Sequence, residues 1–164
     1  MQSFIELAKG YQSYHTKRVT VYTHLIGVPL VVLSLMIALG CIKITVPGYI
    51  NTDLAWILTL GVVVYYTFLN WKLGLVTLPF LLLLLWVAFL FNHDGPHRDT
   101  LYAFLITFVV GWSFQLIGHW LEGKRPAFVD NLFQALIAPM FIVAEVMIIL
   151  GLSYELKCQL HGEE

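Results

Sequence analysis

Residues 73–91 read L-G-L-V-T-L-P-F-L-L-L-L-L-W-V-A-F-L-F and carry no charged side chain. A helix that crosses the hydrocarbon core of a bilayer needs roughly 20 mostly apolar residues, so this stretch is long enough to span a membrane. The whole chain is similar in character: 59% of its 164 residues are hydrophobic, 12% are charged, and the mean hydropathy is +0.81. Soluble domains have roughly 25% charged residues. The sequence therefore predicts an integral membrane protein.

Four other apolar stretches of near-spanning length accompany residues 73–91. We expect an all-α fold, an integral membrane helical bundle that forms one domain over residues 1–164. Apolar residues at helical spacing in residues 1–20 predict an interfacial helix, and residues 153–164 are expected to form a tail. Because residues 70–72 alone separate the second span from the third, these two form either a tight hairpin or a re-entrant pair. The five predicted transmembrane segments are about 25–42, 54–69, 73–91, 101–118 and 132–152.

The composition argues against several functional classes. The formal net charge is −1, and the chain has neither a phosphate-binding loop nor a GxGxxG turn, so we expect no nucleic-acid partner. Cys41 and Cys158 are too few and too far apart for a disulfide framework or a CxxC metal site. The expected surroundings of this chain are the lipid bilayer itself.

The distribution of basic residues predicts the orientation. With five spans and the N-terminus inside, six of the nine lysines and arginines fall on the inner side. The positive-inside rule therefore favours a cytoplasmic N-terminus. The corresponding location is the cytoplasmic membrane of a bacterium or the endoplasmic reticulum of a eukaryote.

Polar residues follow one face at the end of the fourth span, in G-W-S-F-Q-L-I-G-H-W-L-E-G-K-R-P (residues 111–126). Gln115, His119 and Glu122 are spaced i, i+4 and i+7, so on a helix they project from the same side. Glycines on this stretch allow a neighbouring helix to approach closely. These residues either meet a specific site or simply lie among lipid headgroups.

Two more histidines favour a specific site. His15 and His24 flank the first inner boundary, on the same side of the membrane as His119, and three imidazoles suit iron, zinc or copper. On one straight helix His15 and His24 would lie about 13.5 Å apart and face opposite ways. The site therefore requires a break in the chain between them, which we expect near the β-branched residues 19–21.

His93 and His97 lie in the link after the third span. In a five-span arrangement this link faces outward, about 27 Å from His119 at 1.5 Å per residue. Either both histidines are surface residues, or one apolar segment does not cross and His93 supplies a fourth metal ligand.

Further charged residues are candidates for the site. Glu145 falls inside the fifth apolar segment, where a carboxylate is costly unless it faces the bundle interior with a partner. It is either a functional group or a neutral glutamic acid bonded to another helix. Lys124 and Arg125 follow Glu122 and either hold an anionic substrate head or anchor the chain at the inner surface.

Two sequence blocks resemble a known family. The first is Y-x-x-Y-H followed by H-L-I-G-V-P, and the second runs from G-W-S-F-Q-L-I-G-H-W-L-E-G-K-R-P-A-F-V-D-N-L to Q-A-L-I-A-P-M-F-I-V-A-E. Together they resemble the membrane 2-hydroxy fatty acid dioxygenases of the Mpo type, over about residues 8–152. That resemblance implies an Fe(II)-dependent enzyme that uses O2 to shorten a 2-hydroxy fatty acid by one carbon, as in fatty acid α-oxidation.

The resemblance also implies roles for individual residues. By motif position it supports His15, His24 and His119 as metal ligands, beside the weaker candidate His93, and it makes Glu122 and Glu145 catalytic candidates. Two other classes remain open: another metal-dependent lipid enzyme, such as a hydroxylase, and a membrane scaffold or transporter. The chain lacks the HxxxH and HxxHH boxes of the membrane hydroxylases and desaturases. The candidates for binding substrate are Lys124, Arg125, Asn131 and Gln115.

Overall fold

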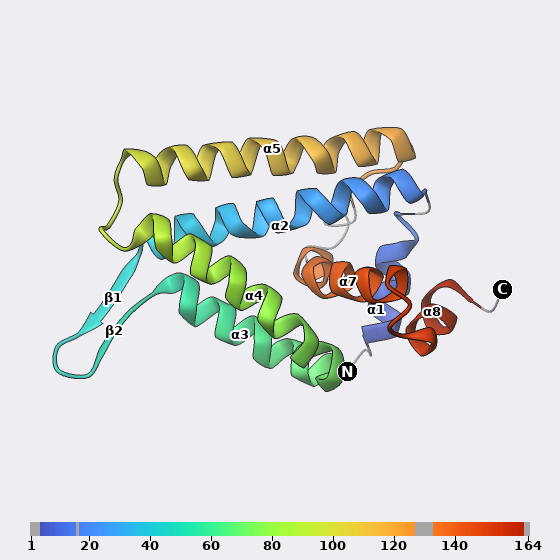
Figure 1. The fold of residues 1–164 in the computed structure, drawn as a ribbon, viewed down its shortest axis with the longest axis horizontal. Coiled ribbons are helices and arrows are strands. Elements are labelled where there is room, and N and C mark those ends of the chain that lie inside the picture. The colour runs from blue at the N-terminus through green and yellow to red at the C-terminus, as the bar shows by residue number, and fades with distance from the viewer. Residues whose placement is uncertain (1–3, 16, 127–132, 163–164) are drawn as a thin grey trace.

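The computed structural model describes residues 4–15, 17–126 and 133–162 (Figure 1). Most of these residues are helical, which confirms the predicted all-α class, and a small antiparallel hairpin is added at one end. The helices are α1 (Phe4–Gln12), α2 (Arg18–Gly40), α3 (Leu54–Leu69), α4 (Trp71–Asn92), α5 (Arg98–Glu122), α7 (Phe133–Ile149) and α8 (Tyr154–His161), and the hairpin strands are β1 (Lys43–Val46) and β2 (Ile50–Asp53).

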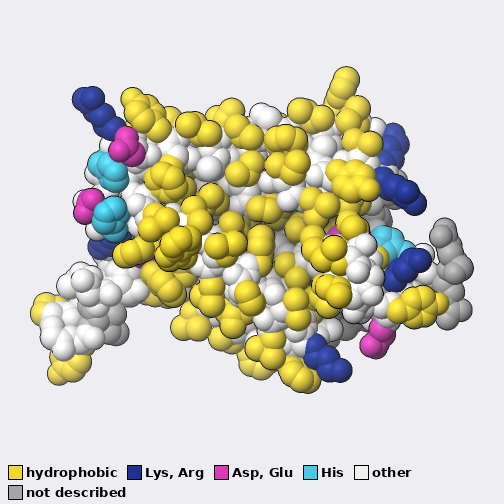
Figure 2. All heavy atoms as spheres, in the orientation of Figure 1, with side chains coloured by type: hydrophobic (Ala, Val, Ile, Leu, Met, Phe, Trp, Pro, Cys, Tyr) yellow, Lys and Arg dark blue, Asp and Glu magenta, His cyan; other side chains and the backbone are white. Residues whose placement is uncertain are grey.

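Three of the described helices, α2, α4 and α5, are long and apolar enough to cross a membrane. They correspond to the first, third and fourth predicted spans. Helix α3 is too short to count as a span, and α7 and α8 could form one only as a broken pair bent by 116°. The structure therefore gives three spans, or four if this pair is counted, rather than the predicted five. Hydrophobic side chains cover the middle of the molecule and charged groups gather at its two ends, as expected in a bilayer (Figure 2).

Helices α2 and α5 lie side by side along their length (Figure 1). Glycines make this approach possible: a Cβ on Gly111 would lie 2.9 Å from the backbone nitrogen of Val31, and one on Gly118 would overlap the hydroxyl of Thr23. In lipid, where apolar helices gain little by leaving their surroundings, such close backbone packing is a main source of association. The glycines that were expected to let a neighbouring helix approach α5 therefore lie in the interface with α2.

Substitution of Gly111 tests this interface. Gly111→Ala is expected to destabilise the protein by about 1–3 kcal/mol, because the added methyl group meets backbone that cannot move without separating the helices. Gly61→Ala on α3 is the matched control, since a Cβ there meets nothing within 4 Å. Thermal unfolding in detergent would measure both variants. Equal melting temperatures would contradict the close packing of α2 on α5.

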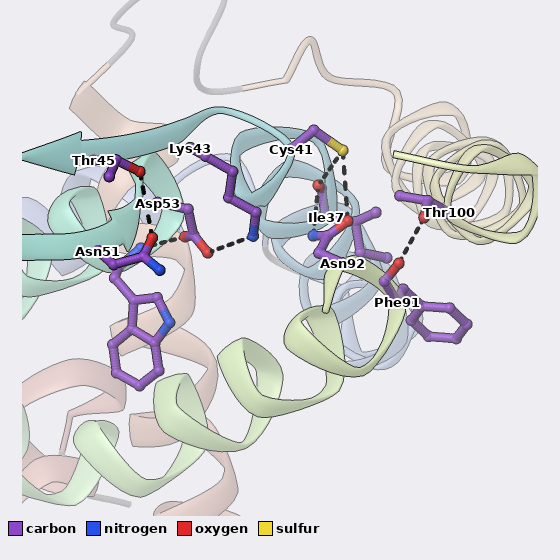
Figure 3. Close-up of polar contacts among 10 residues, drawn as sticks. Ile37, Cys41, Lys43, Thr45, Asn51, Asp53, Phe91, Asn92 and Thr100 are labelled. Atoms are coloured by element: carbon purple, nitrogen blue, oxygen red, sulfur yellow. Dashed lines mark hydrogen bonds and ion pairs between the residues drawn. The ribbon is translucent and has the colours of Figure 1, made fainter. Parts of the chain in front are cut away.

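Side-chain hydrogen bonds fix the end of the bundle that carries the hairpin (Figure 3). Asn92 at the end of α4 donates to the carbonyl of Ile37 on α2 at 2.9 Å, and Cys41 donates to the Asn92 side chain at 3.5 Å. Lys43 and Asp53 pair at 3.3 Å across the base of the hairpin. The Asn92 contacts hold the ends of α2 and α4 together, and the ion pair closes the base of the hairpin, far from the polar end of α5.

The chain breaks between α1 and α2, as the histidine spacing required. The break comes earlier than predicted: the interfacial helix ends at Gln12 rather than near residue 20, and α2 begins at Arg18. Tight turns, in which Tyr14 and His15 donate backbone N–H groups to the carbonyls of Tyr11 and Gln12, end α1. His15 therefore lies in a connection that can turn back toward α2.

The predicted tail, residues 153–164, is partly helical instead. Ser153 accepts a hydrogen bond from the backbone of Leu156 and thereby caps α8. Leu156 and Leu160 are buried, so α8 packs against the bundle. It lies beside α7 and α1 at the same end of the molecule as the first residues of α2 (Figure 1).

Candidate metal centre

Three buried imidazoles meet where α1, α2 and α5 come together. His15 comes from the α1–α2 connection, His24 from the second turn of α2 and His119 from the last turn of α5. The Nε2 atom of His24 lies 3.1 Å from Nε2 of His15 and 3.2 Å from Nε2 of His119. One potential ligand atom from each of the three lies within 4.8 Å of the others. The structure thus brings together three of the four histidines considered as ligands.

Backbone carbonyls orient two of these rings. The Nδ1 of His15 lies 2.7 Å from the carbonyl oxygen of Tyr11, and the Nδ1 of His24 lies 2.8 Å from that of Thr20. A carbonyl only accepts, so each Nδ1 must carry the proton, and in a neutral ring Nε2 then presents a lone pair. Both lone pairs point into the centre of the cluster, which is the arrangement expected of metal-binding histidines.

This arrangement fits a cation better than it fits the histidines alone. Two lone pairs 3.1 Å apart, on His15 and His24, repel each other, and a proton on Nε2 of His119 would relieve only the contact with His24. Imidazole nitrogens bound at about 2.1 Å to one ion, about 90–110° apart, lie roughly 3.0–3.4 Å from one another. The two separations that involve His24 fall in that range, and the ligand atoms of His15 and His119 lie within 4.8 Å of each other. Imidazole donors suit iron, copper, zinc and nickel.

The surroundings of the cluster keep His15 neutral. Burial lowers the pKa of the His15 imidazole below its ordinary value, so the ring is uncharged at neutral pH and its lone pair is available. The ring of Tyr11 stacks on that of His15 with centroids 4.2 Å apart and planes inclined by 14°. Tyr11 is itself buried. One residue thus fixes both the tilt and the tautomer of His15.

Glu122 lies next to the cluster and is buried. Its Oε2 accepts hydrogen bonds from the backbone N–H of Lys17 at 3.0 Å and from the hydroxyl of Thr20 at 2.5 Å. A carboxylate at the start of α2 interacts favourably with the positive end of the helix. It therefore joins the end of α5 to the start of α2, the two segments that carry His119 and His24.

The candidates for substrate binding are spread more widely. Gln115 lies in the α2–α5 interface, where a Cβ on Gly27 would come within 2.9 Å of its Cγ. Lys124 donates its Nζ to the carbonyl of Ser13 at 2.7 Å, and Arg125 is exposed. Asn131 lies outside the described residues.

The structure does not bring His93 to the cluster. His93 is exposed at the end of α4 and lies 2.9 Å from Asp94, while His97 precedes the first turn of α5. The whole length of α5, roughly 35 Å at 1.5 Å per residue, separates this link from His119. The surface alternative thus describes both histidines, because both are exposed and lie at the opposite end of α5 from the cluster.

Glu145 of α7 is buried and has a histidine as its partner. Its Oε1 lies 3.0 Å from Nε2 of His161, a residue within the predicted tail, residues 153–164. The Nδ1 of His161 lies 2.8 Å from the side-chain amide of Gln12. His161 therefore links α8 to α7 and α1.

Sequence reasoning missed Tyr11, Thr20 and His161 as parts of the site. For the first two a signal was present, since each lies four residues before a histidine, the spacing at which a helical carbonyl meets a side chain. For His161 no local signal was present, because its partners, Glu145 and Gln12, are distant from it in the sequence.

The fold and this cluster define a helical membrane protein with a three-histidine centre. The sequence matches the family described as 2-hydroxy-palmitic acid dioxygenase Mpo1-like over residues 1–149, and the chain belongs to that family. It is 36% identical over 155 residues to the 2-hydroxy-palmitic acid dioxygenase MPO1 of Saccharomyces cerevisiae, covering 93% of this chain and 84% of the yeast protein. No solved structure matches the chain significantly.

Proposed function

We propose that this protein is an Fe(II)-dependent dioxygenase that shortens 2-hydroxy fatty acids by one carbon, with His15, His24 and His119 holding the iron. The observation that carries the proposal is the convergence of three Nε2 atoms in a member of a dioxygenase family. Zinc has no redox chemistry, so an oxygenase requires a redox-active ion such as iron at this donor set. The name of the yeast relative supplies the substrate class.

The overall reaction balances without an added reductant. R-CH(OH)-COOH and O2 give R-COOH, CO2 and H2O: the C1–C2 bond breaks, C2 is oxidised to a carboxyl carbon, C1 leaves as CO2, and O2 is the oxidant. Bound iron supplies the activation of O2 and open positions for the 2-hydroxy carboxylate. Three neutral protein ligands leave the positive charge of the ion available to an anionic substrate.

The protein residues proposed for this reaction hold and orient its parts. Tyr11 and Thr20 keep the protons of His15 and His24 on Nδ1, so that both Nε2 atoms remain donors to the ion. Glu122 acts as a positioning residue for this cluster through its bonds to the start of α2. Glu145 is the carboxylate proposed to handle protons near the site, together with His161.

We infer that the end carrying the histidines faces the cytoplasm. Seven of the nine lysines and arginines lie at this end and two lie at the hairpin end. The difference of seven against two is larger than the six against three of the five-span arrangement, and it favours a cytoplasmic N-terminus. The residues at the histidine end are Lys9, Lys17, Arg18, Lys72, Lys124, Arg125 and Lys157, and those at the hairpin end are Lys43 and Arg98.

Metal removal and replacement test the proposal. Purified protein supplied with Fe(II), air and 2-hydroxypalmitate is expected to release pentadecanoate and CO2 in equal amounts, and a chelator is expected to abolish this activity. Fe(II) should restore the activity and Zn(II) should not, because zinc cannot donate electrons to O2. Gas chromatography of the fatty acids would follow the product.

The alternatives predict other products. A hydroxylase would return an acid with all 16 carbons, and a scaffold or transporter would return unchanged substrate although iron is bound. Either result would remove the dioxygenase proposal.

A further inference from the structure

A cavity of about 860 Å³ opens between α1, the start of α2, α7 and α8. Sites for small molecules commonly have volumes of roughly 300–1,000 Å³. His15 lines this cavity, so the cavity borders one ligand of the candidate metal centre. A molecule held here would lie beside the histidine cluster.

The cavity concentrates positive charge. Lys9, Arg18 and Lys157 line it, and none of them pairs with a carboxylate among the residues that the structure describes. Glu145 also lines the cavity, but it is engaged by His161 at 3.0 Å. Cations that share a cleft with low-dielectric walls attract an anion more strongly than cations spread over a surface. The cavity is therefore suited to an anionic group.

Helix α8 is held so that Lys157 faces this cavity. Lys157 and His161 are four residues apart and share one side of α8. The His161 ring contacts Glu145 on α7 and Gln12 on α1, at 3.0 and 2.8 Å, which orients that side inward. Arg18, in the first turn of α2, lines the same cavity.

The cavity also has an apolar part. Val21 lies three residues after Arg18 on α2, and Ile148 and Ile149 come from α7. Both helices belong to the apolar body of the protein (Figure 2). A ligand that complements these walls has one anionic end and one hydrocarbon portion.

We propose that this cavity binds a long-chain carboxylic acid, with Arg18 and Lys157 holding its carboxylate and Val21, Ile148 and Ile149 contacting its chain. This inference rests on the proposed function and deepens it, because the 2-hydroxy acid substrate has this chemistry. It assigns the anion-binding role to residues other than Lys124 and Arg125. Lys124 already donates to the carbonyl of Ser13.

Binding to iron-free protein tests the assignment without any turnover. The affinities of 2-hydroxypalmitate and of 1,2-hexadecanediol, which has the same chain length but no charge, are measured by isothermal titration calorimetry in detergent with a chelator present. Arg18→Gln and Lys157→Gln are each expected to weaken binding of the acid by about tenfold or more, as loss of a charge-assisted hydrogen bond does. The affinity for the diol should not change in either variant. Lys72→Gln serves as the matched charge control and should retain acid binding, while Lys124→Gln tests the competing anion-binding candidate directly.

Several results would overturn the assignment. These are unchanged acid binding in both variants, equal weakening of acid and diol, or a loss seen with Lys124→Gln instead. Dipalmitoyl phosphatidic acid tests a lipid headgroup as the source of the anion: if its binding alone depends on Arg18 and Lys157, the carboxylate assignment is wrong. Iron uptake by each variant checks that the histidine cluster has folded.

The two proposals fail in different ways. Acid binding that depends on Arg18 and Lys157, without formation of pentadecanoate by the iron-loaded wild type, would contradict the dioxygenase reaction alone. Turnover with a KM that is indifferent to both substitutions would contradict the cavity assignment alone.

Discussion

Replacing His119 by alanine is expected to lower iron binding by more than 100-fold and to abolish product formation. The reason is geometric, because His119 supplies one of three Nε2 atoms and the remaining pair, His15 and His24, cannot surround an ion. Loss of a residue that merely supports a metal ligand commonly costs 10–100-fold, and loss of a ligand itself should exceed that. Iron per chain by elemental analysis and pentadecanoate formation would measure the two effects.

His93→Ala is the matched control for this experiment. It also removes an imidazole, but from the exposed link at the opposite end of α5. We expect iron content and turnover near those of the wild type. If His93→Ala lost iron while His119→Ala retained it, the three-histidine centre would be wrong, and the metal would have to lie at the hairpin end of the bundle.

The apolar segments could be predicted from composition because the bilayer requires a long uninterrupted run, which α2, α4 and α5 provide. The helix after the break that follows α7 could not be predicted from hydropathy, since residues 153–164 are mostly polar and come directly after the apolar run of residues 132–152. Its signals are local instead: Gly151 adopts a positive φ of 70°, and Ser153 caps the following helix. The capping serine is the sequence signal that predicts α8 after the apolar run.

The candidate site was only partly predictable for a similar reason. His15, His24 and His119 are conspicuous because histidine is unusual beside an apolar span, and their common side followed from the order of the spans. The groups that orient two of them are the backbone carbonyls of Tyr11 and Thr20, and a carbonyl is present at every position. Only the packed structure decides which of them a ring can reach.

Glu122 shows this limit most clearly, and its substitution gives the second large effect. Glu122→Ala is expected to weaken iron binding by about 10–100-fold, as loss of a residue that supports a metal ligand commonly does. It should also lower the free energy of unfolding by about 1–3 kcal/mol, because the Lys17 N–H and the buried Thr20 hydroxyl lose their acceptor. Iron titration and thermal unfolding measure these changes.

Glu122→Gln separates a positioning role from proton transfer. The amide oxygen of glutamine still accepts a hydrogen bond, so a residue that only joins α5 to Lys17 and Thr20 should keep most of its iron affinity, with kcat reduced in proportion to the iron lost. Fully loaded protein would then turn over at the wild-type rate. If Glu122→Gln binds iron normally but kcat falls by 100-fold or more, Glu122 must act on the substrate itself, since the amide cannot replace a carboxylate as a proton acceptor. The initially predicted catalytic role would then hold, and the bonds to α2 would serve to aim the carboxylate.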